Sequence, residues 1–231
     1  MDFGIAFPSY IRSWHDAKMA EDYGFSHAWF YDSQMLYSDV YACMALAAEH
    51  TNTIKLGTGV AIPSNRIAPV TAHSIATINE LAPGRAILGV GTGFTGRNTM
   101  GLPPVTLAKV RQYIDDCRAL LRGEEILFRE NQHERWIRFL HPDKGFINLK
   151  DKIPLYFAAN GPKAMGMAGE IADGWITVFS DAEHFTKDLE HLAGGAAKAG
   201  RSVDDISRMA LTTACVLGPN ESPTSSRVIE R

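Results

Sequence analysis

The feature that most constrains the fold of this sequence is a repeated alternation between short apolar runs and longer segments with helical spacing. Runs of strand length fall at residues 3–7, 27–31, 54–62, 86–90, 155–159, 175–179 and 209–217. Segments with helical periodicity or helix start and stop signals fall at 13–24, 40–50, 71–82, 110–121, 162–172 and 183–199. Strands that alternate with helices form parallel sheets joined by right-handed crossovers. The sequence therefore predicts an α/β fold with seven strands and six helices.

Residues 124–150 interrupt this alternation with a charged, aromatic and turn-rich segment. We interpret this segment as an inserted loop or hairpin over one rim of a single domain that spans residues 1–231. After residue 217 the chain is polar and turn-prone, and a helix start is indicated only at its very end.

The length of 231 residues bears on the choice between two α/β architectures. An eight-stranded barrel typically needs about 250 residues and cannot close on seven strands, whereas an open doubly wound sheet can stop after any strand. Length alone therefore favours the open sheet. The residues at the strand ends favour the barrel.

Composition excludes several classes of function. The chain has 23 Lys and Arg against 26 Asp and Glu and shows no basic cluster, so no nucleic-acid surface is expected. It has no apolar run of about 18 residues and no signal-peptide pattern, so we expect no membrane association and a cytoplasmic location. Cys43, Cys117 and Cys215 are far apart and are expected to be buried thiols. The eight histidines show no metal-ligand spacing, so no metal site is expected.

Polar and glycine-rich segments follow five of the predicted strands, and both architectures bind ligands at the carboxyl ends of strands. These segments begin at Tyr31, Ala61, Gly91, Ala158 and Phe179. Gly91, Gly93 and Gly96 have the G-x-G-x-x-G spacing that lets backbone N–H groups approach a phosphate. The dinucleotide fingerprint belongs after a first strand, whereas this one follows the fourth and Pro103-Pro104 precede the next helix. A nicotinamide site and a flexible turn both remain alternatives.

A resemblance to a known family rests first on residues 53–93, which read TIKLGTGVAIPSNRIAPVTAHSIATINELAPGRAILGVGTG. This stretch resembles the luciferase-like flavin and deazaflavin oxidoreductases, most closely the methylenetetrahydromethanopterin reductase branch. Further similar motifs lie before and after this stretch, in the expected order along the chain: FGI, AEDYGF, IPLY, AGEIADG and AKAGRS. The resemblance covers nearly the whole chain apart from residues 124–150. It implies an eight-stranded β/α TIM barrel with a flavin-type ring at its mouth, of which seven strands are readable here, so we expect the chain to be incomplete at its C-terminal end.

The resemblance also implies roles for single residues around the ring. Asp32 matches an acidic position beside the reacting face of the ring, although an Asx turn that caps the next segment is the alternative. The pair Gly59 and Val60 matches a non-prolyl cis peptide that bulges against the back of the ring. The remaining implied cofactor contacts are Gly91, Thr92 and Gly93 along the ribityl chain and phosphate, the backbone of Ala158, Ala159, Asn160 and Gly161 at the ring edge, and Ser180 at a phosphate.

Three further residues are candidate substrate contacts. Arg66 is suited to anchor an anionic cofactor tail or a substrate carboxylate, and a solvated loop arginine is the alternative. Ser33 stands where some related deazaflavin dehydrogenases carry a histidine, and Phe94 stands where some carry a glutamate. These two departures disfavour a sugar-phosphate dehydrogenase mechanism that needs that base and acid.

The resemblance therefore implies an oxidoreductase that transfers a hydride between reduced coenzyme F420, or alternatively FMN, and a small organic substrate. An FMN-dependent luciferase-like monooxygenase is a second hypothesis. A flavin-binding protein without turnover is a third, from a different class. Relatives usually dimerise, so a homodimer is expected by resemblance.

Overall fold

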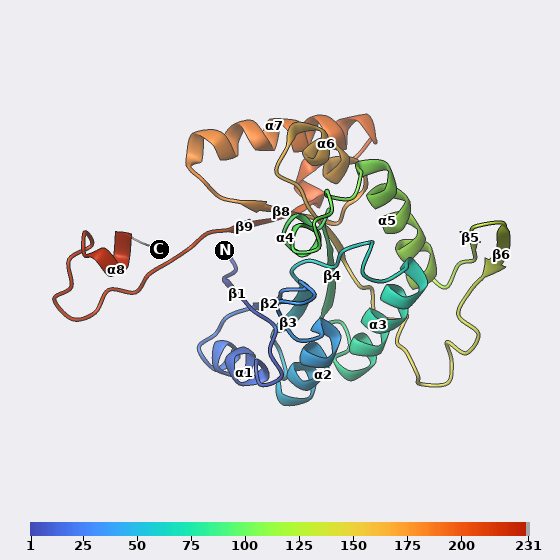
Figure 1. Cartoon of the computed structure of the whole chain (residues 1–231), viewed down its shortest axis with the longest axis horizontal. Coiled ribbons are helices and arrows are strands. Elements are labelled where there is room, and N and C mark those ends of the chain that lie inside the picture. The colour runs from blue at the N-terminus through green and yellow to red at the C-terminus, as the bar shows by residue number, and fades with distance from the viewer. Residues whose placement is uncertain (230–231) are drawn as a thin grey trace.

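A computed structural model of the chain describes residues 1–229 and shows a curled parallel sheet of seven strands (Figure 1). Its strands are β1 (Gly4–Phe7), β2 (His27–Phe30), β3 (Lys55–Thr58), β4 (Ala86–Val90), β7 (Leu155–Ala158), β8 (Gly174–Val178) and β9 (Ser207–Leu211). They are hydrogen-bonded in this same order, so β1 and β9 form the two edges of the sheet. Every neighbouring pair is parallel, as the alternating sequence pattern predicts.

Helices cover the outer face of the sheet, one after nearly every strand (Figure 1). The covering helices are α1 (Trp14–Asp22), α2 (Val40–His50), α3 (Ala68–Leu81), α5 (Leu107–Leu121), α6 (Pro162–Ile171) and α7 (Ala182–Lys198). The apolar stripe that predicts a helix at residues 110–121 is buried along α5, where Val110, Ile114 and Cys117 are fully enclosed. The parallel sheet with its outer layer of helices confirms the predicted α/β class.

The two faces of the sheet bury different residues, because successive side chains of a strand point to opposite sides. In β2, Ala28 and Phe30 belong to the large core between sheet and helices, whereas Trp29 belongs to a separate cluster. That second cluster lies on the inner, concave face and comprises Trp29, Ile87, Tyr156 and Ile176, each from a different strand. Gly57 makes room for the Trp29 ring, since a Cβ at that position would lie 2.5 Å from two ring carbons.

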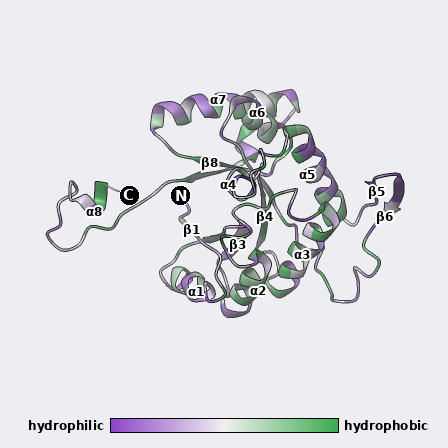
Figure 2. Ribbon diagram, in the orientation of Figure 1, coloured by the Kyte–Doolittle hydropathy of each residue, from purple (hydrophilic) through white to green (hydrophobic). Residues whose placement is uncertain are grey.

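The chain between α5 and β7 forms an antiparallel hairpin that projects from the body of the molecule (Figure 1). Its strands are β5 (Ile126–Glu130) and β6 (His133–Ile137). Figure 2 shows this hairpin as mostly hydrophilic, in contrast to the apolar β4 at the centre of the sheet. The Trp136 side chain on β6 is 62% exposed.

Several predicted boundaries were wrong. The apolar run at 54–62 is a strand only to Thr58, after which the Gly59–Val60 peptide is cis and Ala61 makes an isolated bridge to Val90. The run at 209–217 pairs with β8 only to Leu211. Two short helical elements have no counterpart in the predicted set: α4 (Phe94–Asn98) and the 3-10 helix η1 (Val203–Asp205). The helix start indicated at the chain's end corresponds to α8 (Ser226–Ile229).

The cysteine prediction holds for two of the three thiols. Cys43 and Cys117 are buried, whereas Cys215 is half-buried on the segment that leaves the sheet after β9. Among residues 1–229, no helix is long and apolar enough to cross a membrane.

Candidate active site at the carboxyl ends of the strands

The Asp32 carboxylate follows β2 and is 5% exposed. Its Oδ2 accepts a hydrogen bond from Nη1 of Arg66 at 2.8 Å. The second guanidinium nitrogen of Arg66 donates to Oδ2 of Asp39 at 2.5 Å. Asp39 in turn caps α2, because its Oδ1 accepts from the backbone N–H groups of Tyr41 and Ala42, each at 3.0 Å. The cap of the next helix is therefore Asp39, and within residues 1–229 the Asp32 side chain makes no capping hydrogen bond.

Burial and charge act in opposite directions on Asp32. Burial raises the pKa of Asp32 above the ordinary value of an aspartate, and the adjacent Arg66 guanidinium opposes this shift. Burial acts against ionisation of Asp39 as well, but its bonds from the α2 N-terminus and from Arg66 give a net lowering of the Asp39 pKa. Arg66 therefore joins two carboxylates with different tendencies to hold a proton.

A hollow of about 470 Å³ opens beside this ion-pair cluster. Its walls come from the segments after β2 and β3 and from Met100 after α4. The lining residues are Asp32, Gln34, Met35, Tyr37, Ser38, Asp39, Ser64, Asn65, Arg66 and Met100. Two predicted site residues, Asp32 and Arg66, thus lie together, while Ser33 and Phe94 do not line this hollow.

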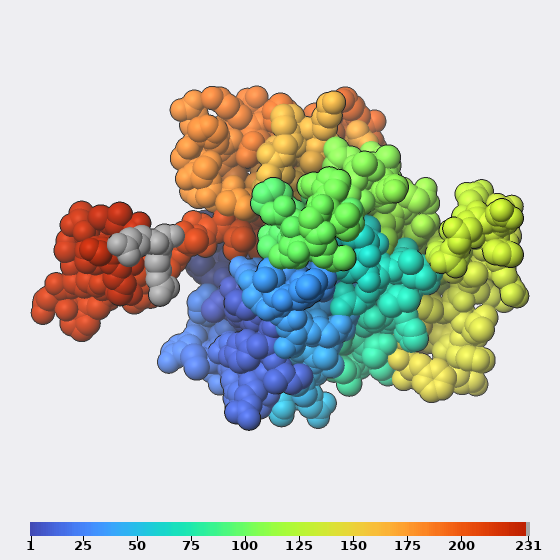
Figure 3. Space-filling model, viewed as in Figure 1, coloured from blue at the N-terminus to red at the C-terminus, as the bar shows by residue number. Residues whose placement is uncertain are grey.

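Gln34 is a residue of this region that sequence reasoning missed. Its Nε2 donates to the Gly96 carbonyl at 2.6 Å, and its Oε1 accepts from Nδ2 of Asn65 at 2.7 Å. One side chain therefore joins the loops after β2, β3 and β4, and Figure 3 shows the second and fourth strands' loops (blue and green) meeting on one face. A Cβ at Gly96 would lie 2.8 Å from this Oε1, so packing accounts for the third glycine of the G-x-G-x-x-G spacing.

Towards the carboxyl ends of the strands, the residues on the inner face of the sheet become very small. Above the bulky cluster around Trp29 lie Gly59, Gly91 and Ala158, with Val60 packed beside them. The Val60 Cγ2 would be only 2.4 Å from a Cβ at Gly91, which shows how closely this side chain crosses β4. Apart from Val60, these residues carry at most a methyl group, so their side chains take up little space on this face of the sheet. The residues present therefore fit a flavin-type ring.

The end of β7 contributes fewer free backbone groups than its sequence indicates. The Ala159 N–H donates to the Ile176 carbonyl at 2.9 Å, and the Ala159 carbonyl accepts from Trp175 Nε1 at 2.8 Å. The Asn160 side-chain oxygen accepts from Thr177 and Val178 on β8, each at 3.1 Å. Within the described residues, the backbone N–H groups of Asn160 and of the next residue, Gly161, have no protein acceptor.

The remaining predicted contacts are scattered around the rim. Gly93 has a φ of 82° and precedes α4, so its left-handed conformation requires a residue without a side chain. The Thr92 carbonyl accepts from Val105 at 2.8 Å. Ser180 is exposed after β8, and the Phe94 side chain is 76% exposed. Across residues 1–229, no cluster of three or more His, Cys, Asp or Glu side chains is arranged to hold a metal ion.

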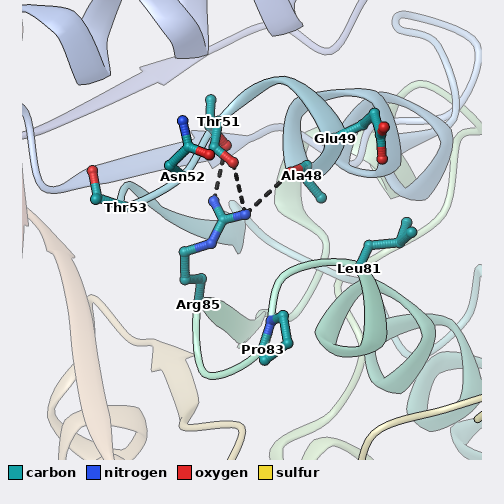
Figure 4. A pocket seen from close by; sticks show the side chains of 8 residues that line it. All are labelled: Ala48, Glu49, Thr51, Asn52, Thr53, Leu81, Pro83 and Arg85. Atoms are coloured by element: carbon teal, nitrogen blue, oxygen red, sulfur yellow. Dashed lines mark hydrogen bonds between the residues drawn. The ribbon is translucent and has the colours of Figure 1, made fainter.

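A second hollow, of about 560 Å³, lies at the opposite, amino ends of the strands (Figure 4). Arg85 crosses it and donates to the Ala48 and Thr51 carbonyls at 3.1 and 2.9 Å, and to Thr51 Oγ1 at 2.9 Å. A fourth bond reaches the Ile54 carbonyl at 3.1 Å. These acceptors lie at and just beyond the C-terminus of α2, where carbonyls lack helical partners. The Arg85 guanidinium is therefore used within the fold.

The curled parallel sheet and its outer layer of helices together define a protein of the β/α-barrel class. More specifically, the chain belongs to the luciferase-like monooxygenase family, whose family model matches residues 12–226. This membership confirms the predicted family and the predicted type of barrel fold.

Individual relatives are identical to this chain at a third or more of the aligned positions. The chain is 37% identical over 213 residues to the 5,10-methylenetetrahydromethanopterin reductase of Methanolobus tindarius. The aligned residues cover 89% of this chain and 63% of that protein. The chain is 38% identical over 181 residues to the F420-dependent glucose-6-phosphate dehydrogenase of Nocardia farcinica, covering 73% and 52%. The chain thus spans less than two thirds of the length of both relatives.

Solved structures agree with this placement. The coenzyme F420-dependent tetrahydromethanopterin reductase from Methanopyrus kandleri superposes with a TM-score of 0.75 at 28% identity, covering 91% of this chain and 65% of that one. An F420-dependent secondary alcohol dehydrogenase also gives a TM-score of 0.75, at 21% identity, and that likeness concerns the fold alone.

Proposed function

We propose that this chain forms the cofactor-binding part of an F420-dependent oxidoreductase. The enzyme would exchange a hydride with a small organic substrate, in the manner of a methylenetetrahydromethanopterin reductase. The observation that carries the proposal is the small-residue surface of Gly59, Gly91 and Ala158 within the same strand-end rim as the buried Asp32. The names of the Nocardia farcinica dehydrogenase and of the Methanopyrus kandleri reductase state F420 dependence, and they support F420 as the cofactor. When bound, the deazaflavin ring supplies or accepts the hydride.

Each of these residues has a distinct task in this proposal. Gly59 and Val60 would support the back of the ring, and Gly91, Thr92 and Gly93 would hold the chain that extends from it. The N–H groups of Asn160 and Gly161, which have no protein acceptor among residues 1–229, are available to donate to the ring edge. Ser180 would contact a phosphate from the exposed segment after β8.

Asp32 is the proposed catalytic residue. Arg66 occupies its Oδ2, and within the described residues no group is hydrogen-bonded to its Oδ1. Oδ1 is therefore the atom that would orient the substrate or exchange a proton with it. Ser33, next to Asp32 in the segment after β2, and Phe94, at the start of α4, are proposed to contact the substrate. The Arg66 side chain at the wall of the hollow is a third proposed contact.

Fluorescence quenching with each cofactor tests this proposal. We expect micromolar affinity for F420 and weaker binding of FMN. Gly91→Val should abolish cofactor binding, because the added side chain would displace Val60, which is proposed to support the back of the ring. Gly194→Val is the control, because it lies on the outer helix α7 and a Cβ there meets nothing within 4 Å. Micromolar FMN binding without F420 binding would favour the monooxygenase hypothesis. Cofactor retention without substrate-dependent bleaching would favour a binding protein.

Two further parts of the proposal concern the protein in the cell. We propose a homodimer and a cytoplasmic location, both on the resemblance to the family. Sedimentation of the purified protein would test the first, and a monomer at micromolar concentration would contradict it.

A further inference from the structure

Arg66 bridges two carboxylates from different segments, a geometry unlike that of a solvated loop arginine. Its side chain is 20% exposed, and its two terminal nitrogens reach Asp32 at 2.8 Å and Asp39 at 2.5 Å. The fork of a guanidinium allows two separate hydrogen bonds at once, which a lysine ammonium cannot arrange with the same directions.

The anchor of this bridge is the start of α2. Asp39 is fixed there by two backbone N–H groups, and the Arg66 guanidinium carbon lies 5.0 Å from the centre of the Tyr41 ring. A cation at this distance over an aromatic face is attracted to it. Arg66 is therefore held by α2 independently of Asp32.

Asp32 depends on this bridge more than Arg66 does. The carboxylate is 5% exposed, and an ionised group at such burial is costly unless it is paired. Within residues 1–229, Arg66 is its single hydrogen-bond partner, and this partner engages only Oδ2.

We propose that Arg66, anchored by Asp39 on α2, is a positioning residue that fixes the orientation of Asp32 and sets the pH at which its free Oδ1 carries a proton. The importance of this role for turnover rests on the proposed function. The effect of Arg66 on the orientation and protonation of Asp32 does not depend on the proposed function.

The charged and titratable groups around Asp32 point the same way. Besides Arg66, its surroundings include Asp39 and Tyr41 from α2 and Tyr113 from α5. Burial raises the pKa of both tyrosines, so they stay neutral. Asp39 disfavours ionisation of Asp32, and Arg66 is the positive charge that favours it.

A carboxyl 13C NMR titration of aspartate-labelled protein, with the Asp32 signal assigned through Asp32→Asn, tests the proposal without any cofactor. Arg66→Met should raise the pKa of Asp32 by about 1 to 3 units, and Arg66→Lys by less. Arg111→Met is the control, since Arg111 pairs with Glu170 on the outer helices. An Asp32 pKa that is the same in wild type and Arg66→Met would overturn the proposal.

Asp39→Ser tests the anchor separately. Serine still caps a helix but is too short to reach the guanidinium. Because Asp39→Ser also removes a negative charge that raises the pKa of Asp32, the anchor is tested by comparing the effect of Arg66→Met in two backgrounds. We expect Arg66→Met to raise the Asp32 pKa less in Asp39→Ser than in the wild type. An equal change in both backgrounds would remove Asp39 from the proposal. Folding of each variant is checked by circular dichroism, and the Arg66→Lys variant keeps the comparison open if Arg66→Met does not fold.

Turnover provides the second readout, with reduced F420 and methylenetetrahydromethanopterin as the trial pair. The limb of the pH profile that Asp32 controls should move to higher pH in Arg66→Met, and Arg66→Lys should partly restore it. A limb that stays in place while the NMR pKa moves would overturn the catalytic part of the inference. Wild-type protein without any F420 reaction would instead contradict the proposed function, while the titration would still decide the role of Arg66.

Discussion

The two ends of helix α2 adjoin two hollows, each crossed by an arginine with different partners. At the N-terminal end, Arg66 binds the side chains of Asp32 and Asp39. At the C-terminal end, Arg85 binds three backbone carbonyls and the Thr51 hydroxyl. The hollow beside Arg85 is the larger, at about 560 against 470 Å³.

The partners of these two arginines therefore indicate their tasks better than the sizes of the hollows beside them. Backbone carbonyls do not titrate, so Arg85 can only hold the chain in place. Carboxylates change charge with pH, so Arg66 acts on groups with chemistry of their own. In β/α barrels the carboxyl ends of the strands carry the active site and the amino ends contribute stability, which matches this contrast.

Removing Asp32 should have the largest effect on function. We expect Asp32→Ala to reduce turnover by about 10² to 10⁴-fold, the usual contribution of a positioned acid or base, and to change cofactor affinity far less. Turnover and cofactor affinity are measured by F420 bleaching and fluorescence quenching. Asp22→Ala at the exposed end of α1 is the control. An unchanged rate would show that Asp32 takes no part in the chemistry. The hollow beside Arg66 would then have only a structural role, like the hollow beside Arg85.

Removing Arg85 should have the largest effect on stability. Arg85→Met leaves the carbonyls at the end of α2 without a donor, and we expect a loss of about 2 to 3 kcal/mol in the free energy of unfolding. Urea denaturation measures it, and Arg122→Met, whose side chain is 63% exposed, is the control. F420 turnover below the unfolding midpoint should be unchanged. A large loss of turnover in a folded variant would break the contrast between the two ends of α2.

Glu21, near the hollow beside Arg85, is expected to have a smaller effect on stability, and this effect depends on pH. Its Oε1 accepts from the backbone N–H groups of Asn52, Thr53 and Ile54, at 2.6 to 3.0 Å. Burial opposes ionisation, but these bonds and the Thr53 hydroxyl lower the pKa of Glu21 from 4.5 to about 2. The folded pKa lies below the unfolded one, so its contribution is complete above pH 4.5 and is lost as the pH falls towards 2.

We therefore expect Glu21→Gln to lower stability by about 1 to 2 kcal/mol at pH 7 and to flatten the dependence on pH below 4.5. Thermal unfolding at a series of pH values measures both. Glu124→Gln, at a side chain that is 55% exposed, should change neither. Equal acid sensitivity of wild type and Glu21→Gln would show that this carboxylate does not support the loop.

The smallest expected effect concerns Asn52, whose exposed side chain lines the hollow beside Arg85. Within residues 1–229 this side chain makes no hydrogen bond, and only the backbone N–H of Asn52 donates to Glu21. Asn52→Ala should alter stability by no more than about 0.5 kcal/mol and leave turnover unchanged. Urea denaturation and F420 bleaching measure these quantities. A clear fall in turnover would mean that the hollow beside Arg85 takes part in function.

Much of the fold could be predicted, because alternating strands and helices leave strong periodic patterns. The stripe along α5 is an example, since its apolar residues all face the core. The end of β3 could not be predicted, because residues after Thr58 remain apolar although they leave the ladder. The short α4 has only five residues and no apolar period, so tertiary contacts rather than local pattern account for it.

The candidate site divides in the same way. Asp32 stood out because it is an acidic residue directly after a strand. The bonds of Gln34 did not, because its partner Gly96 lies 62 residues away and only the folded loops bring them together. Nor does spacing reveal that Arg66 pairs with Asp32 and Asp39, since two of these residues lie on one loop and the third on another.

The bonds of Gln34 also bear on how this scaffold can acquire new specificity. One amide holds three loops that would ordinarily be free to vary one at a time, so a change of length or direction in one of them disturbs the other two. Grafting a single loop from a relative should therefore yield poorly assembled rims. Exchanging all three as one cassette, together with the glutamine, is therefore the practical unit for engineering this protein.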